Sequence, residues 1–215
     1  MAPTTETKRA RILLADDHAL VAAGLAKLLE QDFELLATSG DGRELLELVE
    51  HNHPEVVVLD ISMPNLNGLE VARRLRNTAP NIKIVFVTVH SDLAYVGAAF
   101  RAGASGYVLK GSAASELREA VWSALQGKMF LTPLVDRAAL DSILKQPEQR
   151  SPLTRRQQEV LQLVAEGHSA KAIGESLRIS SKTVEFHKSL IMKRLNLHSV
   201  AELTRYAMEH RISDY

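Results

Sequence analysis

The sequence predicts an α/β domain built on a five-stranded parallel sheet, followed by a small domain made only of helices. Three observations lead to this prediction. Short apolar runs alternate with helical patterns over the first 125 residues, a proline-bearing stretch follows, and the last 65 residues have helical periodicity without a strand signal. A chain of 215 residues, of which 46% are hydrophobic, is long enough to fill two packed cores.

The α/β domain is expected from strands and helices that alternate along the chain. Five short runs of apolar and β-branched residues have the length and composition of buried strands. Strands that alternate with amphipathic helices lie parallel, joined by right-handed crossovers, with helices on both faces of the sheet. The expected strands span residues 11–16, 33–39, 55–60, 83–89 and 106–110, and the expected helices span residues 18–31, 41–52, 67–79, 92–104 and 112–128.

The pattern loosens after the last of these helices. A short helix is expected after Pro133, and the charged stretch "PEQRSP" with its two prolines suits a linker. Four helical segments follow, over residues 154–167, 169–178, 180–195 and 199–211. We therefore expect an α/β domain over residues 9–126, a linker over residues 127–150 and a helical domain over residues 151–215.

Composition limits the classes of protein that fit. Lysine and arginine together number 26, as do aspartate and glutamate, so the overall charge favours no class of partner. The absence of cysteine excludes disulfides, cysteine metal sites and thiol nucleophiles. The sequence has no secretory signal and no apolar run of the roughly 20 residues that a membrane span needs, so we expect a cytoplasmic protein without membrane contact. The eight histidines lack metal-ligand spacing and are expected not to be ligands.

Polar side chains stand where the expected strands end, and these ends share one edge of a parallel sheet. Carboxylates placed close together raise one another's pKa unless a cation joins them, and Mg²⁺ prefers oxygen ligands of this kind. An isolated aspartate after a strand is more often a helix N-cap. Five polar or charged residues at successive strand ends instead favour a functional site. The residues are Asp16, Asp17, Asp60, Thr88 and Lys110.

These residues lie in four segments: "LLADDH", "VVVLDISMPNLNG", "VFVTVH" and "GASGYVLK". In order and spacing they resemble the signature segments of the receiver domain of two-component response regulators. The resemblance implies a flavodoxin-like fold in which Asp60 accepts a phosphoryl group from a sensor histidine kinase, with Mg²⁺ as cofactor. It also implies that Asp17, Asp60 and the main-chain carbonyl of Ser62 bind the metal, with Asp16 acting directly or through water.

The same resemblance assigns the catalytic and switch residues. Lys110 and Mg²⁺ are cations that neutralise charge on the phosphoryl oxygens as the group transfers. Thr88 donates its hydroxyl to a phosphoryl oxygen once Asp60 is modified. Tyr107 is implied to be the aromatic residue that rotates inward to fill the space that Thr88 vacates, so that a local charge shifts a two-state surface.

The helical segments from Leu153 to about Met208 resemble the helix-turn-helix domain of the LuxR type, and with the receiver they resemble the NarL/FixJ group. Thr154 suits a helix N-cap, and Gly174 permits close approach in the scaffold helix. Arg178 stands where the turn of this family usually carries glycine, so a positive φ there costs about 1 kcal/mol. By resemblance, the segment over residues 199–211 pairs two copies of the domain, which implies a homodimer.

The segment over residues 180–195 is expected to enter the major groove of double-stranded DNA with its N-terminal side chains toward the bases. Lysines suit phosphates and guanine edges, a glutamate can accept from cytosine, and an aromatic ring can contact the thymine methyl group. The expected contacts are Lys182, Thr183, Glu185, Phe186, Lys188, Ser189 and Lys193. The expected inward-facing residues are Val184, Leu190, Ile191 and Leu195.

Taken together, the two resemblances imply a response regulator in which phosphorylation of Asp60 controls dimerisation and sequence-specific DNA binding, and so regulates transcription with the transcription machinery. Its catalysis would be limited to phosphotransfer to its own Asp60 and to autodephosphorylation. Two alternatives stay open at this point. One is a regulator that binds DNA without phosphorylation control, although the set of site residues is complete. The other is a Mg²⁺-dependent phosphohydrolase with an aspartyl nucleophile, which leaves the helical segments unexplained.

Overall fold

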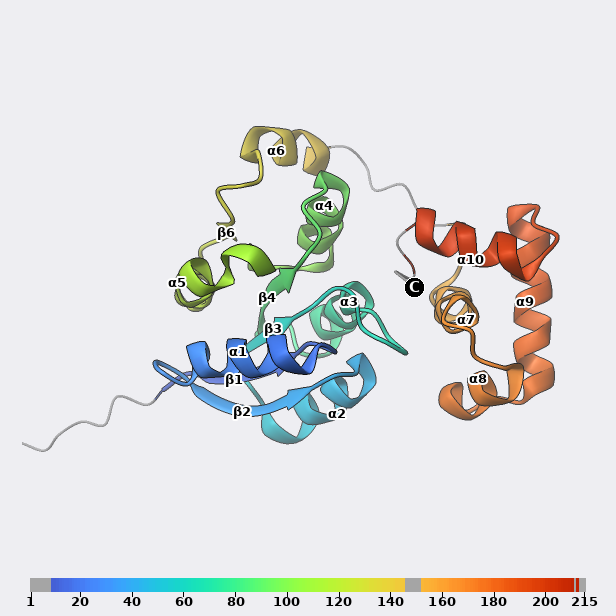
Figure 1. Cartoon of the computed structure of the whole chain (residues 1–215), viewed down its shortest axis with the longest axis horizontal. Coiled ribbons are helices and arrows are strands. Elements are labelled where there is room, and N and C mark those ends of the chain that lie inside the picture. The colour runs from blue at the N-terminus through green and yellow to red at the C-terminus, as the bar shows by residue number, and fades with distance from the viewer. Residues whose placement is uncertain (1–8, 146–151, 211, 213–215) are drawn as a thin grey trace, which may run out of the picture.

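The computed structural model describes residues 9–145, 152–210 and 212. Figure 1 shows an α/β unit and, beside it, a helical unit formed by the C-terminal part of the chain. All strand pairs are parallel, and the strand order is β2-β1-β3-β4-β5-β6. The strands are β1 (Arg11–Ala15), β2 (Glu34–Ser39), β3 (Val56–Leu59), β4 (Lys83–Thr88), β5 (Gly106–Leu109) and β6 (Phe130–Leu131).

Helices cover both faces of the sheet, as the sequence predicts. Alternate residues of β1 separate the two cores: Ile12 and Leu14 pack with helices α1 and α5, whereas Leu13 and Ala15 pack with α2, α3 and α4. Both faces of each central strand are therefore buried, which explains the continuous apolar runs. The helices are α1 (Ala19–Leu29), α2 (Gly42–Asn52), α3 (Gly68–Thr78), α4 (Leu93–Ala102) and α5 (Ala113–Leu125), with a short 3₁₀ turn at Lys110–Ser112.

The prediction of five strands was wrong by one, because β6 pairs with β5 at the edge of the sheet. Two residues are too few to give a period-2 pattern, so this strand has no sequence signal of its own. The helix expected after Pro133 is present as α6 (Arg137–Lys145), with Leu140 fully buried in the same core as α4. We propose that the N-terminal unit extends to residue 145; the expected boundary near Arg150 lies outside the described residues.

The C-terminal unit has a core of its own, formed between its helices by residues such as Val160, Leu161, Ile173 and Leu203. A capping box begins its first helix, because the Thr154 hydroxyl accepts from the Gln157 amide while the Gln157 side chain accepts from the Thr154 amide. The helices are α7 (Arg155–Ala165), α8 (Ala170–Leu177), α9 (Ser181–Leu195) and α10 (Val200–Glu209).

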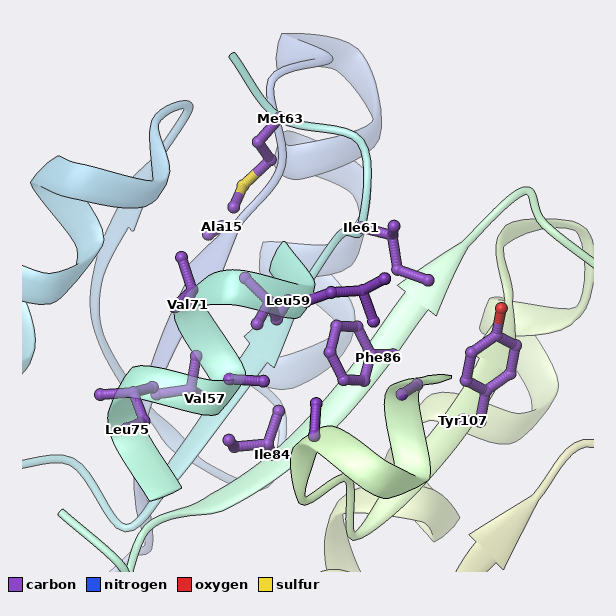
Figure 2. Close-up of a cluster of buried hydrophobic side chains, with 14 of the residues drawn as sticks. Ala15, Val57, Leu59, Ile61, Met63, Val71, Leu75, Ile84, Phe86 and Tyr107 are labelled. Carbon is purple, nitrogen blue, oxygen red and sulfur yellow. The ribbon is translucent and has the colours of Figure 1, made fainter. Parts of the chain in front are cut away.

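One core extends beyond the end of β3 into the loop that follows it. Figure 2 shows Leu59, Ile61 and Met63 in the same cluster of buried side chains as Phe86, with Met63 beside Ala15. Ile61 and Met63 are nearly fully buried, as is Leu66 further along the same loop. The loop is thus anchored by its apolar side chains, although it lies outside the sheet.

Candidate functional site

Asp60 is the first residue after β3, and its carboxyl group is held from two sides. Its backbone amide donates to the Ala15 carbonyl, which continues the pairing of β3 with β1 for one more residue. One carboxylate oxygen, Oδ1, accepts from the Ile61 amide at 2.7 Å. The other, Oδ2, lies 2.6 Å from Nζ of Lys110. Only 3% of the residue is exposed, so its orientation is fixed by these contacts.

Lys110 joins two of the carboxylates that the sequence places at strand ends. It follows β5, and its Nζ lies 2.7 Å from Oδ2 of Asp16 as well as 2.6 Å from Asp60. Asp16 is also nearly fully buried, because it follows β1 in the centre of the sheet. A single ammonium group therefore neutralises part of the charge of two buried carboxylates.

Asp17 and His18 complete the acidic cluster. One ligand atom from each of Asp16, Asp17, His18 and Asp60 lies within 4.8 Å of the others, and Nδ1 of His18 is 2.7 Å from Oδ1 of Asp17. Carboxylate oxygens at this separation are the donors that a hard divalent cation requires. The residues present therefore fit a Mg²⁺ ion on the basis of their chemistry and spacing.

The charges in this cluster alter the pKa of two groups. Burial raises the pKa of Asp60, and the neighbouring Asp16 raises it further, while the hydrogen bond and charge of Lys110 act in the opposite direction. Burial lowers the pKa of Lys110, but its hydrogen bonds to Asp16 and Asp60 outweigh that effect, so the pKa is raised overall. The raised pKa favours the charged form of Lys110 beside the two carboxylates.

Thr88 and Tyr107 are both fully buried, on the neighbouring strands β4 and β5. The Tyr107 ring points inward, between Phe86 and Phe100, and its hydroxyl donates to the carbonyl of His90 at 2.8 Å. Figure 2 shows the Tyr107 ring beside β4, within the labelled core. Tyr107 is therefore buried in this structure, and its role as a switch residue stays a prediction.

His90 links this tyrosine to the loop after Asp60. Its Nε2 lies 2.8 Å from Oγ of Ser62, and its ring stacks on Tyr95 with the ring centroids 3.9 Å apart. Its backbone carbonyl accepts from Tyr107. Ser62, whose carbonyl is an expected metal ligand, is therefore connected through one histidine to the expected switch residue.

The expected DNA-contacting helix, α9, begins at a serine cap. The hydroxyl of Ser180 accepts from the Thr183 amide at 3.0 Å and lies 2.8 Å from the Thr183 hydroxyl. Gly174 explains how α8 and α9 meet, since a Cβ there would lie 2.7 Å from the carbonyl oxygen of Ile179. The close approach of the two helices that the sequence predicts is present.

One face of α9 is buried and the other is open. Val184 and Ile191 are fully buried, and Leu195 packs against the same core. Leu190 was expected to face inward but is exposed, because it is rotated by about 100° from Ile191 on a helix with 3.6 residues per turn. It lies one turn from the exposed Phe186, on the open face.

The seven expected DNA contacts differ in exposure. Lys182, Glu185, Phe186, Ser189 and Lys193 are exposed, whereas Thr183 and Lys188 are half-buried. Nζ of Lys188 lies 3.0 Å from Oε1 of Glu185, one turn away, so this lysine has a local partner in the absence of DNA. Thr183 is engaged by the cap of its own helix.

Comparison with known proteins identifies both units. Residues 12–122 match the family described as response regulator receiver domain, and residues 151–207 match the bacterial regulatory proteins of the luxR family. The chain is a response regulator of the LuxR family. It is 38% identical over 208 residues to the transcriptional regulatory protein DegU of Brevibacillus brevis, covering 87% of this chain and 88% of that protein. It is 34% identical over 217 residues to the oxygen regulatory protein NreC of Staphylococcus epidermidis, covering 95% and 100%.

The solved structure of the response regulator RcsB in complex with DNA is similar over both units. It aligns with a TM-score of 0.57 and 26% identity, and covers 93% of this chain and 98% of RcsB. The likeness confirms a flavodoxin-like receiver followed by a helical domain. None of the helices in the described part of this response regulator is long and apolar enough to cross a membrane.

Two histidines of this response regulator were missed as site residues. His18 follows the aspartate pair in "LLADDH", and His90 follows the strand in "VFVTVH". Each histidine is the last residue of one of these segments, and that position could have identified it. Metal-ligand spacing could not, because His18 and His90 lie far apart in the chain. The structure places both beside the expected metal ligands, at Asp17 and Ser62.

The turn of the helix-turn-helix shows the strain that the sequence predicts. Arg178 adopts φ 53° and ψ 46°, the left-handed conformation, directly after α8. A side chain with a Cβ is disfavoured there by about 1 kcal/mol. Its amide donates to the Glu175 carbonyl, so the response regulator keeps the helix end closed without a glycine.

Gly68 gives the first prediction for this response regulator. A Cβ at Gly68 would lie 2.0 Å from the carbonyl oxygen of Asp60, a contact that only a backbone shift can relieve. Gly68→Ala should therefore lower the free energy of unfolding by about 1–3 kcal/mol, the usual cost of overpacking. Denaturant unfolding followed by circular dichroism measures this change.

Gly24→Ala provides the matched control. Gly24 lies within α1 and a Cβ there would have nothing within 4 Å, so alanine should raise stability by about 0.5–1 kcal/mol. Equal effects of the two substitutions would show that the approach of Gly68 to Asp60 does not constrain the site.

Proposed function

We propose that the chain is a phosphorylation-controlled transcription regulator in which Asp60 is the phosphoacceptor. The observation that supports this most is the placement of the buried Asp60 carboxylate against Lys110, at 2.6 Å, beside the acidic cluster. A carboxylate oxygen of Asp60 attacks the phosphorus of a phosphohistidine on the sensor kinase. The phosphorus–oxygen bond forms as the phosphorus–nitrogen bond breaks, and the imidazole leaves with the bonding electrons and gains a proton.

The residues around Asp60 have separate tasks in this proposal. Asp16, Asp17, Asp60 and the Ser62 carbonyl would hold Mg²⁺, which when bound neutralises phosphoryl charge. Lys110 holds a phosphoryl oxygen as a compact point charge. The Thr88 hydroxyl donates to another oxygen. Hydrolysis of the acyl phosphate at the same site would return the chain to its resting state.

A switch at Tyr107 is the proposed route from the site to the surface. The buried Tyr107 hydroxyl donates to the His90 carbonyl, and the His90 amide donates to the Thr88 hydroxyl at 3.5 Å, so a shift of Thr88 would reach Tyr107 through His90. A ligand or covalent group shifts such an equilibrium only by binding the two packed states differently. The phosphoryl group, with its charge at Asp60, supplies that difference.

We propose that the output is DNA binding by α9, in the cytoplasm, as a dimer. Five of the seven expected contacts are exposed on α9, and α10 exposes Val200 and Met208, although Leu203 and Ala207 of the same helix are fully buried. A second copy of α10 would cover these apolar side chains. RcsB dimers bound to DNA have been solved, which favours the same arrangement for this relative.

The test is incubation of the full chain with Mg²⁺ and a small phosphodonor such as acetyl phosphate. Mass spectrometry of peptides should find one phosphoryl group, on Asp60. Phosphate on another residue, or none at all, would contradict the proposal. A hydrolase would instead release phosphate over many turnovers from varied phosphomonoesters, and measurement of free phosphate separates that alternative.

Lys182→Ala tests the DNA-binding face. Lys182 is exposed near the start of α9, and a phosphate contact contributes about one released counterion, so the slope of log K against log salt should fall by about 1. Binding should weaken on all sequences alike. The measurement is fluorescence anisotropy on a duplex selected by the wild-type chain, over a range of salt concentrations.

The control for this substitution is Lys128→Ala, which removes the same charge from an exposed position of the receiver. It should leave the salt slope unchanged. If the salt slope of Lys182→Ala were as unchanged as that of Lys128→Ala, Lys182 would not contact a DNA phosphate.

A further inference from the structure

The loop between Asp60 and α3 is held from outside by the DNA-binding domain. Nε2 of Gln162, on α7, donates to the Met63 carbonyl at 3.1 Å, and the Asn67 amide donates to Oε1 of the same glutamine at 3.2 Å. The Asn65 amide donates to Oε2 of Glu166 at 3.3 Å. Three alternate residues of the loop thus bond through their backbones to two side chains one helical turn apart.

The buried side-chain amide of Gln162 is satisfied by this contact. Only 3% of the residue is exposed, and a buried amide is costly unless its donor and acceptor are satisfied. Its Nε2 also donates to Oε1 of Glu166 at 2.8 Å, so the two side chains hold each other in place. The amide therefore fits the loop backbone with both of its polar atoms.

The surrounding interface is polar, which is typical of units that separate and dock again. Arg74 of α3 pairs with Glu159 of α7, and Arg43 of α2 donates to the Ser176 carbonyl. A cavity of about 160 Å³ lies beside these contacts, with lining residues that include Leu69 of α3 and Gln158 of α7. The two units are thus joined by several directed hydrogen bonds and an ion pair.

The held loop is the one that carries the proposed metal ligand. The Ile61 amide donates to Oδ1 of Asp60, and the Gly68 amide donates to the Ile61 carbonyl, so the far end of the loop is bonded to the residue next to Asp60. Ser62 lies between Ile61 and Met63, whose side chains are buried in the core. Gln162 adds contacts to the backbone of the same loop, at Met63 and Asn67.

We infer that Gln162 is a positioning residue for the receiver site. When the DNA-binding domain is docked, Gln162 holds the loop in one conformation. The Ser62 carbonyl is then already in place, and Mg²⁺ binding costs less conformational entropy. This inference rests on the proposed function, because the metal ligands belong to that proposal. Coupling between two sites is reciprocal, so Mg²⁺ strengthens docking by the same factor by which docking strengthens Mg²⁺ binding.

The first measurement is isothermal titration of the full chain with Mg²⁺, comparing wild type, Gln162→Ala and Gln158→Ala. Loss of the two loop hydrogen bonds should weaken Mg²⁺ binding about threefold to tenfold in Gln162→Ala. Gln158→Ala is the matched control, since Gln158 is on the same helix and lines the interface cavity. It should bind Mg²⁺ as the wild type does.

The second measurement is amide hydrogen exchange of the same three proteins with and without Mg²⁺. In the wild type, Mg²⁺ should slow exchange in α7 as well as in the loop, and Gln162→Ala should lose the effect in α7. A general loss of stability would speed exchange without altering its dependence on Mg²⁺.

Wild-type Mg²⁺ affinity and wild-type Mg²⁺ dependence of exchange in Gln162→Ala would overturn the inference while leaving the proposed function intact. Failure of the wild-type chain to bind Mg²⁺ would instead overturn the proposed function and the inference together.

Discussion

Replacing Asp60 by asparagine should abolish uptake of phosphate from acetyl phosphate in the presence of Mg²⁺. The side-chain amide is nearly isosteric with the carboxylate but is neither charged nor nucleophilic, so the phosphorus–oxygen bond cannot form. The fold should be retained, because the carbonyl oxygen of the asparagine side chain can still accept from the Ile61 amide at this buried position. Intact-protein mass spectrometry measures the result as the absence of the phosphorylated species.

Asp92→Asn is the control for this substitution. Asp92 is exposed at the start of α4 and makes no side-chain cap hydrogen bond there, so its replacement removes one negative charge without touching the cluster. It should take up phosphate at the wild-type rate. Uptake by Asp60→Asn at that same rate would show that another residue is the phosphoacceptor.

Replacing Lys110 by alanine should slow phosphorylation by about 100-fold, the usual effect of removing one preorganised group that stabilises developing charge. The loss has a second component. Burial already raises the pKa of Asp60, and Lys110 is the group that opposes this, so its removal raises that pKa further. The protonated carboxyl cannot attack, and a larger fraction of Asp60 is then protonated at any given pH.

The sign of the pH effect follows from this shift. Phosphorylation falls as the pH falls through the pKa of Asp60, and in Lys110→Ala that fall should occur at a higher pH than in the wild type. The rate of phosphate incorporation as a function of pH measures both changes. Lys110→Arg keeps the positive charge. Its pH dependence should therefore be close to that of the wild type, while its phosphorylation rate should remain below the wild-type rate. An unchanged rate and pH profile in Lys110→Ala would exclude the lysine from the chemistry.

The sequence was sufficient to predict that Asp16, Asp60 and Lys110 lie close together, because their positions depend on where strands end. Each strand stops at or just before the polar residue that the pattern marks: β1 before Asp16, β3 before Asp60 and β5 before Lys110. Parallel pairing then brings these positions to one edge, whatever the helices do. The meeting of these residues at one edge therefore follows from where the strands end and how they pair.

Three features of the structure could not be predicted from the sequence, each for a different reason. The strand at Phe130–Leu131 is too short to have a period, and exposure of Leu190 depends on a rotation of one residue along α9. Docking of Gln162 onto the loop depends on the relative position of two units, which no local pattern encodes. A polar residue on an amphipathic helix is expected to face solvent, and only the assembled interface shows that Gln162 is buried.

The most direct test of phosphorylation control is the affinity of the full chain for its selected duplex before and after treatment with acetyl phosphate and Mg²⁺, with Asp60→Asn carried through both arms. Phosphorylation should change the affinity and the oligomeric state of the wild type, and the treatment should change neither in Asp60→Asn. Equal affinity of the phosphorylated and unphosphorylated wild type, with an unchanged oligomeric state, would contradict phosphorylation control.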